Sequence, residues 1–246
     1  MKELEREAAK NLASLRRNPY PGRGLVLGLS PDGIHLIQIY WIMGRSPNSQ
    51  NRVFGSDNED RIFTEAADPS KVTDPSLIIY NALGEICDCY VVSNGSQTDS
   101  VLKTIQIGNF HGAIEQITYE PDEPNFTPRI TGIHIPVSPQ GEALAQIAVV
   151  RRAPWDNSTI RNIYHYETLP RGIGFCVTTY QGDGNPLPAF EGEPYPVPLE
   201  DDDLDSIAKT YWDTLSPDNR VSLVVKFINH DQCTSTHKII NRFSRV

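Results

Sequence analysis

A stretch of twelve residues, Tyr119–Ile130, concentrates side chains that could transfer protons on a bound ligand. Its sequence, YEPDEPNFTPRI, holds three carboxylates, an amide, a hydroxyl, a guanidinium and three prolines. Proline fixes the backbone φ angle and therefore restricts such a loop. A carboxylate near arginines retains its charged form and can act as a general base, which makes Glu120 and Arg129 candidate functional residues. The alternative is a structural salt bridge.

A second polar cluster covers residues 44–52, with the sequence GRSPNSQNR. Arginine binds phosphates and planar oxyanions through paired N–H groups, so Arg45 and Arg52 are candidates for contacts with an anion. The alternative is a solvated hairpin loop.

Two further clusters follow strand-like segments. Residues 94–99, NGSQTD, predict a turn followed by a helix that Thr98 or Asp99 caps, and the N–H groups at a helix start can also bind phosphate. Residues 172–188 place small residues before Tyr180, and glycines in a strand allow a ligand or another backbone to approach closely. The alternative for this segment is a bulged strand with a tight turn.

The elements that must position these clusters follow from hydrophobic periodicity and turn signals. Helices are predicted over residues 3–17, 99–118 with an interruption near 108–109, and 202–215. Strands are predicted over 24–29, 34–43, 77–80, 86–92, 130–137, 143–151, 172–180, 221–228 and 237–243. Because strands often follow each other in hairpin-like pairs, the pattern favours a layered α+β fold with antiparallel sheets.

Composition excludes several classes of protein. The chain has 246 residues and a formal net charge of -9, which argues against general nucleic-acid binding. The N-terminus lacks the apolar run of a signal peptide and no stretch is long enough to span a membrane, so we expect a cytoplasmic protein with four reduced cysteines. His230, Cys233 and His237 form a loose triad without a paired-cysteine knuckle, and we expect no bound metal.

Taken together, the clusters resemble the archaeal-type inosine monophosphate (IMP) cyclohydrolase family, including its bacterial members. The similarity runs from about residue 20 to about residue 240. The segments that carry it are Gly22-Arg23, Gly44-Arg45-Ser46 with Asn51-Arg52, Asn94-Gly95 with Asp99, Tyr119-Glu120, and Asn125 with Thr127-Pro128-Arg129-Ile130. We expect residues 1–20 to form a helical extension and residues 21–246 to form a single domain.

The resemblance implies a four-layer αββα sandwich like that of N-terminal-nucleophile hydrolases, but without the N-terminal nucleophile. It implies that the carboxamide nitrogen of 5-formamidoimidazole-4-carboxamide ribonucleotide attacks the formyl carbon and that water is lost to give IMP. The partner would be this small purine ribonucleotide, and neither a metal nor an organic cofactor is needed for a redox-neutral condensation. The sequence leaves the oligomeric state open, a homo-oligomer included.

The resemblance also implies roles for individual residues. Glu120 would transfer a proton at the carboxamide, and Arg45, or alternatively Arg52, would polarise the formyl oxygen. Tyr80 and Tyr180 would donate hydrogen bonds near the ring. The candidates for ribose, phosphate and carboxamide contacts are Arg23, Asn94, Asp99, Asn125, Thr127 and Arg129. Two other functions stay open: an amidohydrolase acting on a C–N bond, and a non-catalytic purine-nucleotide-binding protein.

Overall fold

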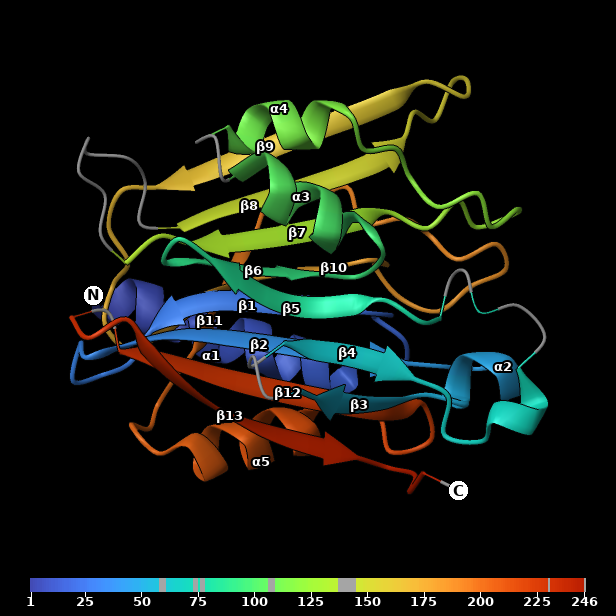
Figure 1. Ribbon diagram of the computed structural model, residues 1–246. Coiled ribbons are helices and arrows are strands. Elements are labelled where there is room, and N and C mark those ends of the chain that lie inside the picture. Colours follow the sequence, from blue (N-terminus) through green and yellow to red (C-terminus); the bar gives the residue numbers. More distant parts are fainter. Residues whose placement is uncertain are drawn as a thin grey trace.

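The protein consists of two antiparallel β-sheets with helices on their outer faces (Figure 1). The computed structural model describes residues 1–57, 61–72, 75, 78–105, 109–136, 145–229 and 231–245. The six-stranded sheet, here sheet A, has the order β11 (Tyr195–Pro198), β10 (Ile173–Thr178), β1 (Gly24–Leu29), β2 (His35–Met43), β12 (Arg220–Asn229) and β13 (Thr234–Asn241). The seven-stranded sheet, sheet B, has the order β3 (Val53–Ser56), β4 (Ile62–Glu65), β5 (Asn81–Ile86), β6 (Cys89–Ser93), β7 (Arg129–His134), β8 (Ala145–Arg152) and β9 (Thr159–Tyr166).

Three apolar clusters define four layers in the order helix, sheet, sheet, helix. The central cluster joins the facing sides of the two sheets and includes Leu27 of β1, Tyr40 of β2 and Ile147 of β8. On the outer side of sheet A, a second cluster packs against α1 (Lys2–Arg17) and α5 (Leu204–Thr214). On the outer side of sheet B, a third cluster packs against α3 (Gln97–Ile105) and α4 (Phe110–Glu115). The central strands β1, β2 and β12 therefore bury both of their faces, as strands of a sheet between two layers must.

Local sequence explains where the outer helices lie. In α1, Ala8 and Leu15 fall on the buried face, and Leu15 joins the cluster outside sheet A. The side chain of Asn11 donates a hydrogen bond to the Pro196 carbonyl on β11 at 2.9 Å. At α5, the Asp203 side chain accepts a hydrogen bond from Ser206 N at 2.8 Å, which satisfies one of the free N–H groups of the first turn. The N-terminal helix thus packs against the same sheet as the C-terminal helix.

The predicted α+β class with two antiparallel sheets is confirmed. The separate helices α3 and α4 also agree with the predicted interruption; Gly108 itself lies outside the described residues, as do Leu77, Val137 and Ala143 at the ends of predicted strands.

The predicted strand 77–80 is misplaced, and the predicted strand 86–92 agrees with β6 only from Cys89 onwards. The hairpin consists of β5 and β6, and its turn is made by Cys87 (φ 48°) and Asp88 (φ 58°). Positive φ is uncommon for residues other than glycine, so no turn signal marked this position. The structure also contains α2 (Pro47–Gln50) and the 3₁₀ helix η1 (Pro69–Lys71).

Four strands had no predicted counterpart: β3, β4, β9 and β11. Strands β3 and β9 lie at the edges of sheet B and β11 at one edge of sheet A. Strand β9 has no fully buried residue, and β11 contains two prolines, which are tolerated at an edge because the strand has one unpaired side. The sequence therefore did not predict β9, in which apolar and polar residues alternate weakly, or β11, which contains proline. Both strands form only because a neighbouring strand offers hydrogen bonds.

Antiparallel pairing brings the predicted polar clusters to one end of the two sheets. Gly24 at the start of β1 pairs with Trp41 near the end of β2 and with Thr178 at the end of β10. In sheet B, Ser93 at the end of β6 pairs with Thr131 near the start of β7. The loops that follow β2, β6 and β10, and the loops that precede β1 and β7, therefore meet at this end.

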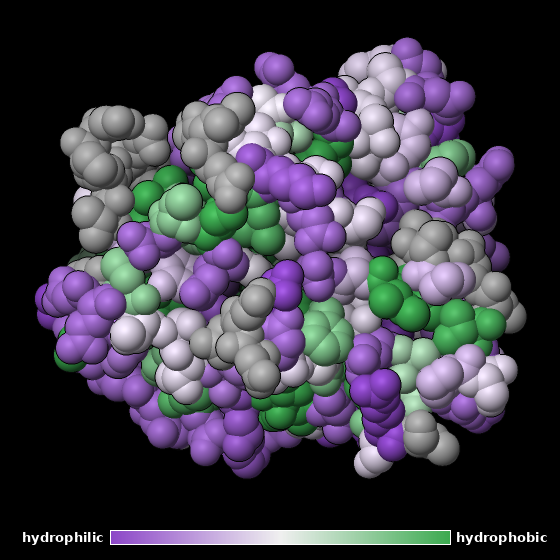
Figure 2. Space-filling view, in the orientation of Figure 1, coloured by the Kyte–Doolittle hydropathy of each residue, from purple (hydrophilic) through white to green (hydrophobic). Residues whose placement is uncertain are grey.

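The face shown in Figure 2 is mainly hydrophilic, and its apolar residues form separate groups rather than a continuous band. No helix within the described residues has the length and apolar character needed to cross a membrane. The four cysteines, all of them within the described residues, form no disulfide.

Candidate functional site

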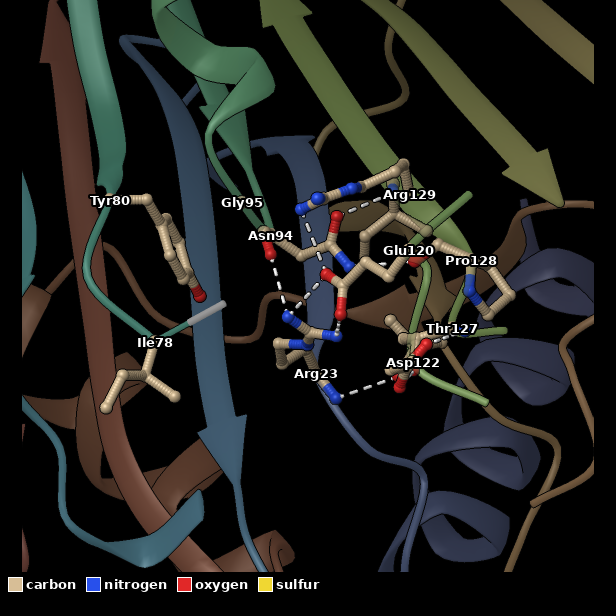
Figure 3. A network of polar contacts seen from close by, with 12 residues as sticks. Arg23, Ile78, Tyr80, Asn94, Gly95, Glu120, Asp122, Thr127, Pro128 and Arg129 are labelled. Carbon is tan, nitrogen blue, oxygen red and sulfur yellow. Dashed lines mark hydrogen bonds and ion pairs between the residues drawn. The ribbon is translucent and has the colours of Figure 1, made fainter. Parts of the chain in front are cut away.

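A buried carboxylate between two arginines lies at the centre of the site (Figure 3). Both terminal guanidinium nitrogens of Arg23 contact Glu120, with Nη1–Oε1 and Nη2–Oε2 distances of 2.8 Å. Arg129 Nη1 approaches Glu120 Oε1 from the other side at 2.9 Å. We call Arg23, Glu120 and Arg129 the buried triad.

Burial controls the electrostatics of the buried triad. The side chain of Glu120 is 3% exposed, and those of Arg23 and Arg129 are 10% and 11% exposed. Burial alone would lower the pKa of Arg23, but the adjacent Glu120 carboxylate overrides this effect and holds that pKa well above its usual range. Burial lowers the pKa of Arg129, although Glu120 opposes this effect.

Two glycines make room for the arginines. Gly22 has φ +72°, and a Cβ atom there would lie 2.2 Å from Thr179 Oγ1, which accepts a hydrogen bond from the Arg23 backbone N–H. A Cβ atom on Gly95 would lie 1.6 Å from Arg129 Nη1. A side chain at Gly22 would collide with Thr179 and Tyr180, and one at Gly95 would collide with the Arg129 guanidinium, so glycine is required at both positions.

The loop that carries Glu120 is closed on itself by hydrogen bonds. Glu120 N donates to Thr127 O at 2.9 Å, and Thr127 N donates to Asp122 Oδ1 at 2.6 Å. Asn125 N and Phe126 N both donate to Asp122 O. The position of Glu120 relative to the start of β7 is therefore fixed by Asp122 and backbone bonds as well as by the prolines.

Two members of the buried triad border a cavity of about 390 Å³, which falls within the usual size range of small-molecule sites, whereas Arg129 is not among its lining residues. Arg23 and Glu120 line it, together with residues from the loop after β2 and the loops on either side of Thr127 and Tyr180. The other lining residues are Tyr20, Gly22, Met43, Arg45, Ser46, Asn48, Ser49, Arg52, Ile78, Asp122, Asn125, Thr127, Tyr180 and Leu187.

The two candidate arginines of the loop after β2 occupy different environments in this cavity. Arg52 is buried, and its Nε and Nη2 donate to the carbonyls of Ser49 (2.8 Å) and Met43 (3.1 Å). Within the part of the chain that the structure describes, no carboxylate lies at ion-pair distance from Arg52. Arg45 is 38% exposed, pairs with Asp183 and lies over the Tyr20 ring at 4.8 Å.

Burial lowers the pKa of Arg52, opposed mainly by Tyr80. Because the pKa of an arginine lies far above 7, Arg52 still carries its positive charge at neutral pH. It is therefore a buried cation on the cavity wall, paired only with carbonyl oxygens among the described residues, and is suited to an anionic group of a ligand.

Tyr80 lies beside this cation but is not itself a lining residue of the cavity. Its hydroxyl is 2.7 Å from the hydroxyl of Tyr40, whose pKa burial raises well above the usual value. Figure 3 shows the Tyr80 ring on the opposite side of the site from Glu120. Ile78, two residues before Tyr80, does line the cavity.

Asn94 and Asp99 are not among the residues that line the cavity. The Asn94 side chain donates to Pro128 O and accepts from Ile130 N, both at 2.8 Å, while its backbone carbonyl accepts from Arg23. Asn94 thus holds the start of β7 and one guanidinium in place. Asp99 is exposed on α3 and accepts a hydrogen bond from Asn81 at 2.8 Å.

The predicted helix cap at Thr98 or Asp99 is wrong, because α3 already begins at Gln97. Thr98 instead donates through its hydroxyl to Gly95 O. Helix α3 therefore starts two residues earlier than a cap at Thr98 would place it.

Two lining residues were missed by sequence reasoning. Asp122 is one of three carboxylates in its loop, and nothing in the sequence separates its role from that of Glu123. Tyr20 precedes Pro21 in a segment without any strand or helix signal, yet it stacks on Tyr180 with a ring-centroid distance of 6.0 Å. Only the closing of α1 against sheet A brings Tyr20 to the cavity.

The geometry provides three chemical functions within one cavity. Arg52 offers a positive charge, the tyrosine hydroxyls offer neutral hydrogen-bonding groups, and Glu120 offers a carboxylate. Only Arg23 Nη2 donates a hydrogen bond to the Glu120 carboxylate, at Oε2, whereas the Nη1 atoms of Arg23 and Arg129 lie at ion-pair distance from Oε1 without hydrogen-bond geometry. Because a carboxylate has about four acceptor positions, Glu120 keeps free positions for a ligand proton.

Among the described residues, no group of three or more histidine, cysteine, aspartate or glutamate side chains is placed to hold a metal ion. His230 of the triad considered in the sequence lies outside those residues.

Comparison with known proteins identifies relatives of this chain. A family model described as "IMP cyclohydrolase-like protein" matches residues 20–232. A protein of Methanothrix thermoacetophila named IMP cyclohydrolase is 30% identical over 201 residues, which cover 78% of this chain and 85% of that protein. A protein of Methanosphaera stadtmanae with the same name is 29% identical over 169 residues, which cover 65% of this chain and 80% of that protein. The family match includes sheet B, all strands of sheet A except β13, and every residue of the cavity, and the chain belongs to the IMP cyclohydrolase-like protein family.

Proposed function

We propose that the protein is an IMP cyclohydrolase that closes the second ring of the purine nucleotide. The substrate would be 5-formamidoimidazole-4-carboxamide ribonucleotide, and the products IMP and water. Family membership supports this proposal, as do the names of two relatives. The observation that carries it at the level of residues is the buried triad, which faces a cavity that also contains the cation of Arg52.

The ring closure is intramolecular, so the first task of the cavity is to hold a reactive conformer. The carboxamide nitrogen must lie close to the formyl carbon and be aligned with it, and most of the rate enhancement of such reactions comes from this positioning. A cavity with a buried cation on one wall and a fixed carboxylate on another can orient the two ends of the ligand.

The second task is to stabilise the oxyanion that develops on the formyl oxygen. Arg52 is the better placed of the two candidate arginines, because it is buried and no carboxylate of the described residues neutralises it. A charge fixed in a site of low dielectric stabilises a developing anion more strongly than an exposed charge does. Arg45, which pairs with Asp183, would contribute to ligand binding at the entrance of the cavity.

The third task is proton transfer. Glu120 takes a proton from the carboxamide nitrogen through a free acceptor position of its carboxylate and returns it to the formyl oxygen, which gives a cyclic carbinolamine. Arg23 and Arg129 hold the carboxylate in one orientation while the proton moves. Asn125, Thr127 and Tyr180 would contact the rest of the ligand, with Asn94 acting through Arg23 and β7.

Further features belong to the same proposal. The sandwich would be related to that of N-terminal-nucleophile hydrolases, residues 1–20 would be an extension of a single domain, and the enzyme would bind its nucleotide in the cytoplasm as part of purine biosynthesis. The ring closure would need neither a metal nor an organic cofactor, because it is a redox-neutral condensation.

Replacement of the carboxylate tests the proposal. We expect Glu120→Gln and Glu120→Asp to lower the rate of ring closure, followed by ultraviolet absorbance, by about 10²-fold or more, because each removes or displaces the proton acceptor. Glu120→Asp keeps the charge between the arginines, so it separates the loss of chemistry from the loss of fold. Asp183→Asn, at the other ion pair of the cavity, is the matched control and should turn over at nearly the wild-type rate.

Near wild-type turnover by both Glu120 variants, folded by circular dichroism, would contradict the assignment of Glu120. A wild-type protein that binds IMP but never forms it from the formamido precursor would instead identify a nucleotide-binding protein without this activity.

A further inference from the structure

We propose that Asp122, Thr127 and Tyr180 form a proton relay that protonates the departing hydroxyl group in the dehydration step. This inference rests on the proposed ring closure and assigns its second proton transfer, separate from the transfer at Glu120.

The three side chains form a continuous chain of hydrogen bonds along the cavity wall. Asp122 Oδ2 accepts a very short hydrogen bond from Thr127 Oγ1, and Thr127 Oγ1 is 2.5 Å from the Tyr180 hydroxyl. All three residues line the cavity. The chain joins the loop before β7 to the segment after β10, so it links residues from both sheets.

The anchoring of each member favours a relay over a loose polar cluster. Asp122 Oδ1 is occupied by Thr127 N at 2.6 Å, which leaves Oδ2 directed at the threonine hydroxyl. Thr127 is 1% exposed and Tyr180 is 5% exposed, so bulk water does not compete for these bonds. Tyr180 is further held by its stacking on Tyr20.

The direction of the chain depends on the protonation state of Asp122. When Asp122 is ionised, Thr127 donates to it and Tyr180 donates to Thr127. When Asp122 is protonated it becomes the donor, each hydroxyl can turn round, and the O–H of Tyr180 is free to point into the cavity. A hydroxyl can accept one proton while releasing another, so Thr127 transmits the change without titrating.

The surroundings of both ends agree with this role. Burial raises the pKa of Asp122, and Glu120 adds to this effect, whereas the hydrogen bonds from Thr127 and the charge of Arg23 oppose it. Arg129 is the other charged group that interacts with Asp122. Burial also raises the pKa of Tyr180, so its phenol keeps a proton to donate at neutral pH.

The step balances in atoms and charge. Tyr180 gives its proton to the hydroxyl of the cyclic carbinolamine, Thr127 gives its proton to Tyr180, and Asp122 gives its proton to Thr127. The C–O bond breaks and its electron pair leaves with water. The lone pair of the former formamido nitrogen forms the C=N bond, and the proton of that nitrogen passes to Glu120. Exchange with water in the cavity then restores Asp122 and Glu120.

Removal of the central hydroxyl tests the relay while keeping its backbone bonds. Thr127→Val preserves the shape and the N–H bond to Asp122, and we expect it to lower kcat by about 10²-fold, as for the loss of a general acid, while KM rises only a few-fold through the loss of a ligand contact. Thr127→Ser keeps the hydroxyl and should restore kcat to within a few-fold of the wild type. Thermal unfolding of both variants separates this effect from a loss of fold.

The pH profile distinguishes a relay from a structural contact. The relay requires protonated Asp122, so kcat of the wild type should fall as the pH rises through the pKa of Asp122. This limb should disappear in Thr127→Val and in Asp122→Asn. Infrared difference spectra of the protein with IMP should show a carboxylic-acid band that titrates and that Asp122→Asn abolishes.

Thr127→Val turnover within threefold of the wild type, Thr127→Ser as slow as Thr127→Val, or the absence of the acid band would each overturn the relay while wild-type ring closure stands. If the wild type forms no IMP, the proposed function itself fails.

Discussion

Two arginine–carboxylate contacts border the same cavity, and they differ in almost every physical respect. In the buried triad, the Glu120 side chain is 3% exposed and contacts Arg23, directly before β1, and Arg129, the first residue of β7. In the pair at the cavity entrance, Arg45 and Asp183 are 38% and 51% exposed and both lie in loops. The same residue types therefore make a fixed charge array in one place and a solvated contact in the other.

The comparison teaches that environment, and not residue type, decides what such a pair can do. Exposed pairs are screened by water and salt and contribute about 0–1 kcal/mol to stability. In a buried cluster the removal of one member leaves charges without compensation, which costs about 3–5 kcal/mol. A buried array also keeps its geometry when a ligand binds, as catalysis requires.

The largest expected difference between the two regions is in stability, and it is measured by neutralising the carboxylate of each ion pair. Glu120→Gln leaves Arg23 and Arg129 facing each other without a counter-ion, and we expect the free energy of unfolding to fall by about 3–5 kcal/mol. Asp183→Asn should lower it by less than about 1 kcal/mol. Urea unfolding at neutral pH measures both, and equal losses would remove the distinction between the two regions.

The next effect separates the two candidate arginines. Arg52→Met should reduce kcat of ring closure by about 10²-fold, because a fixed charge facing the oxyanion is lost. Arg45→Met should act mainly on KM, because Arg45 lies at the entrance and is held by an exposed ion pair. Steady-state kinetics with both variants decide the assignment; a larger loss of kcat in the Arg45 variant would reverse it.

The smallest effect concerns the support of the buried triad. Asn94→Ala removes a side chain that holds Pro128 and Ile130 and leaves their backbone groups unpaired, so we expect a loss of about 1–3 kcal/mol in unfolding free energy. Asp99→Ala, on the exposed face of α3, should change it by no more than about 0.5 kcal/mol. Thermal or urea unfolding measures the difference, and an effect of Asp99 as large as that of Asn94 would contradict a purely local role for Asp99.

The predictability of the fold varied with the type of strand. Strands β1, β2, β10 and β12 were found because their apolar runs are long and bounded by turns. The edge strands β9 and β11 were not, because a polar or proline-containing segment becomes a strand only when a neighbour offers hydrogen bonds. The hairpin turn at Cys87 and Asp88 adopts positive φ without glycine or asparagine, so local propensity pointed elsewhere.

The site was predicted in its parts but not in its pairings. The sequence pointed to Glu120, Arg23, Arg52, Thr127 and Tyr180, all of which line the cavity. It could not show that Glu120 pairs with Arg23, because 97 residues separate them and only the packing of β1 beside β7 brings them together.

The sequence by itself determined the α+β class, the antiparallel arrangement of the strands and the concentration of functional groups around Tyr119–Ile130. These features depend on hydrophobic periodicity and turn residues, which act over short distances along the chain. Tertiary structure alone decided that Arg45 stays in solvent while Arg23 and Arg129 enclose Glu120, and that Asp122 contacts Thr127 and Tyr180. The physical reason is that burial and charge pairing are properties of a site assembled from both sheets, and no local segment contains the neighbours that set them.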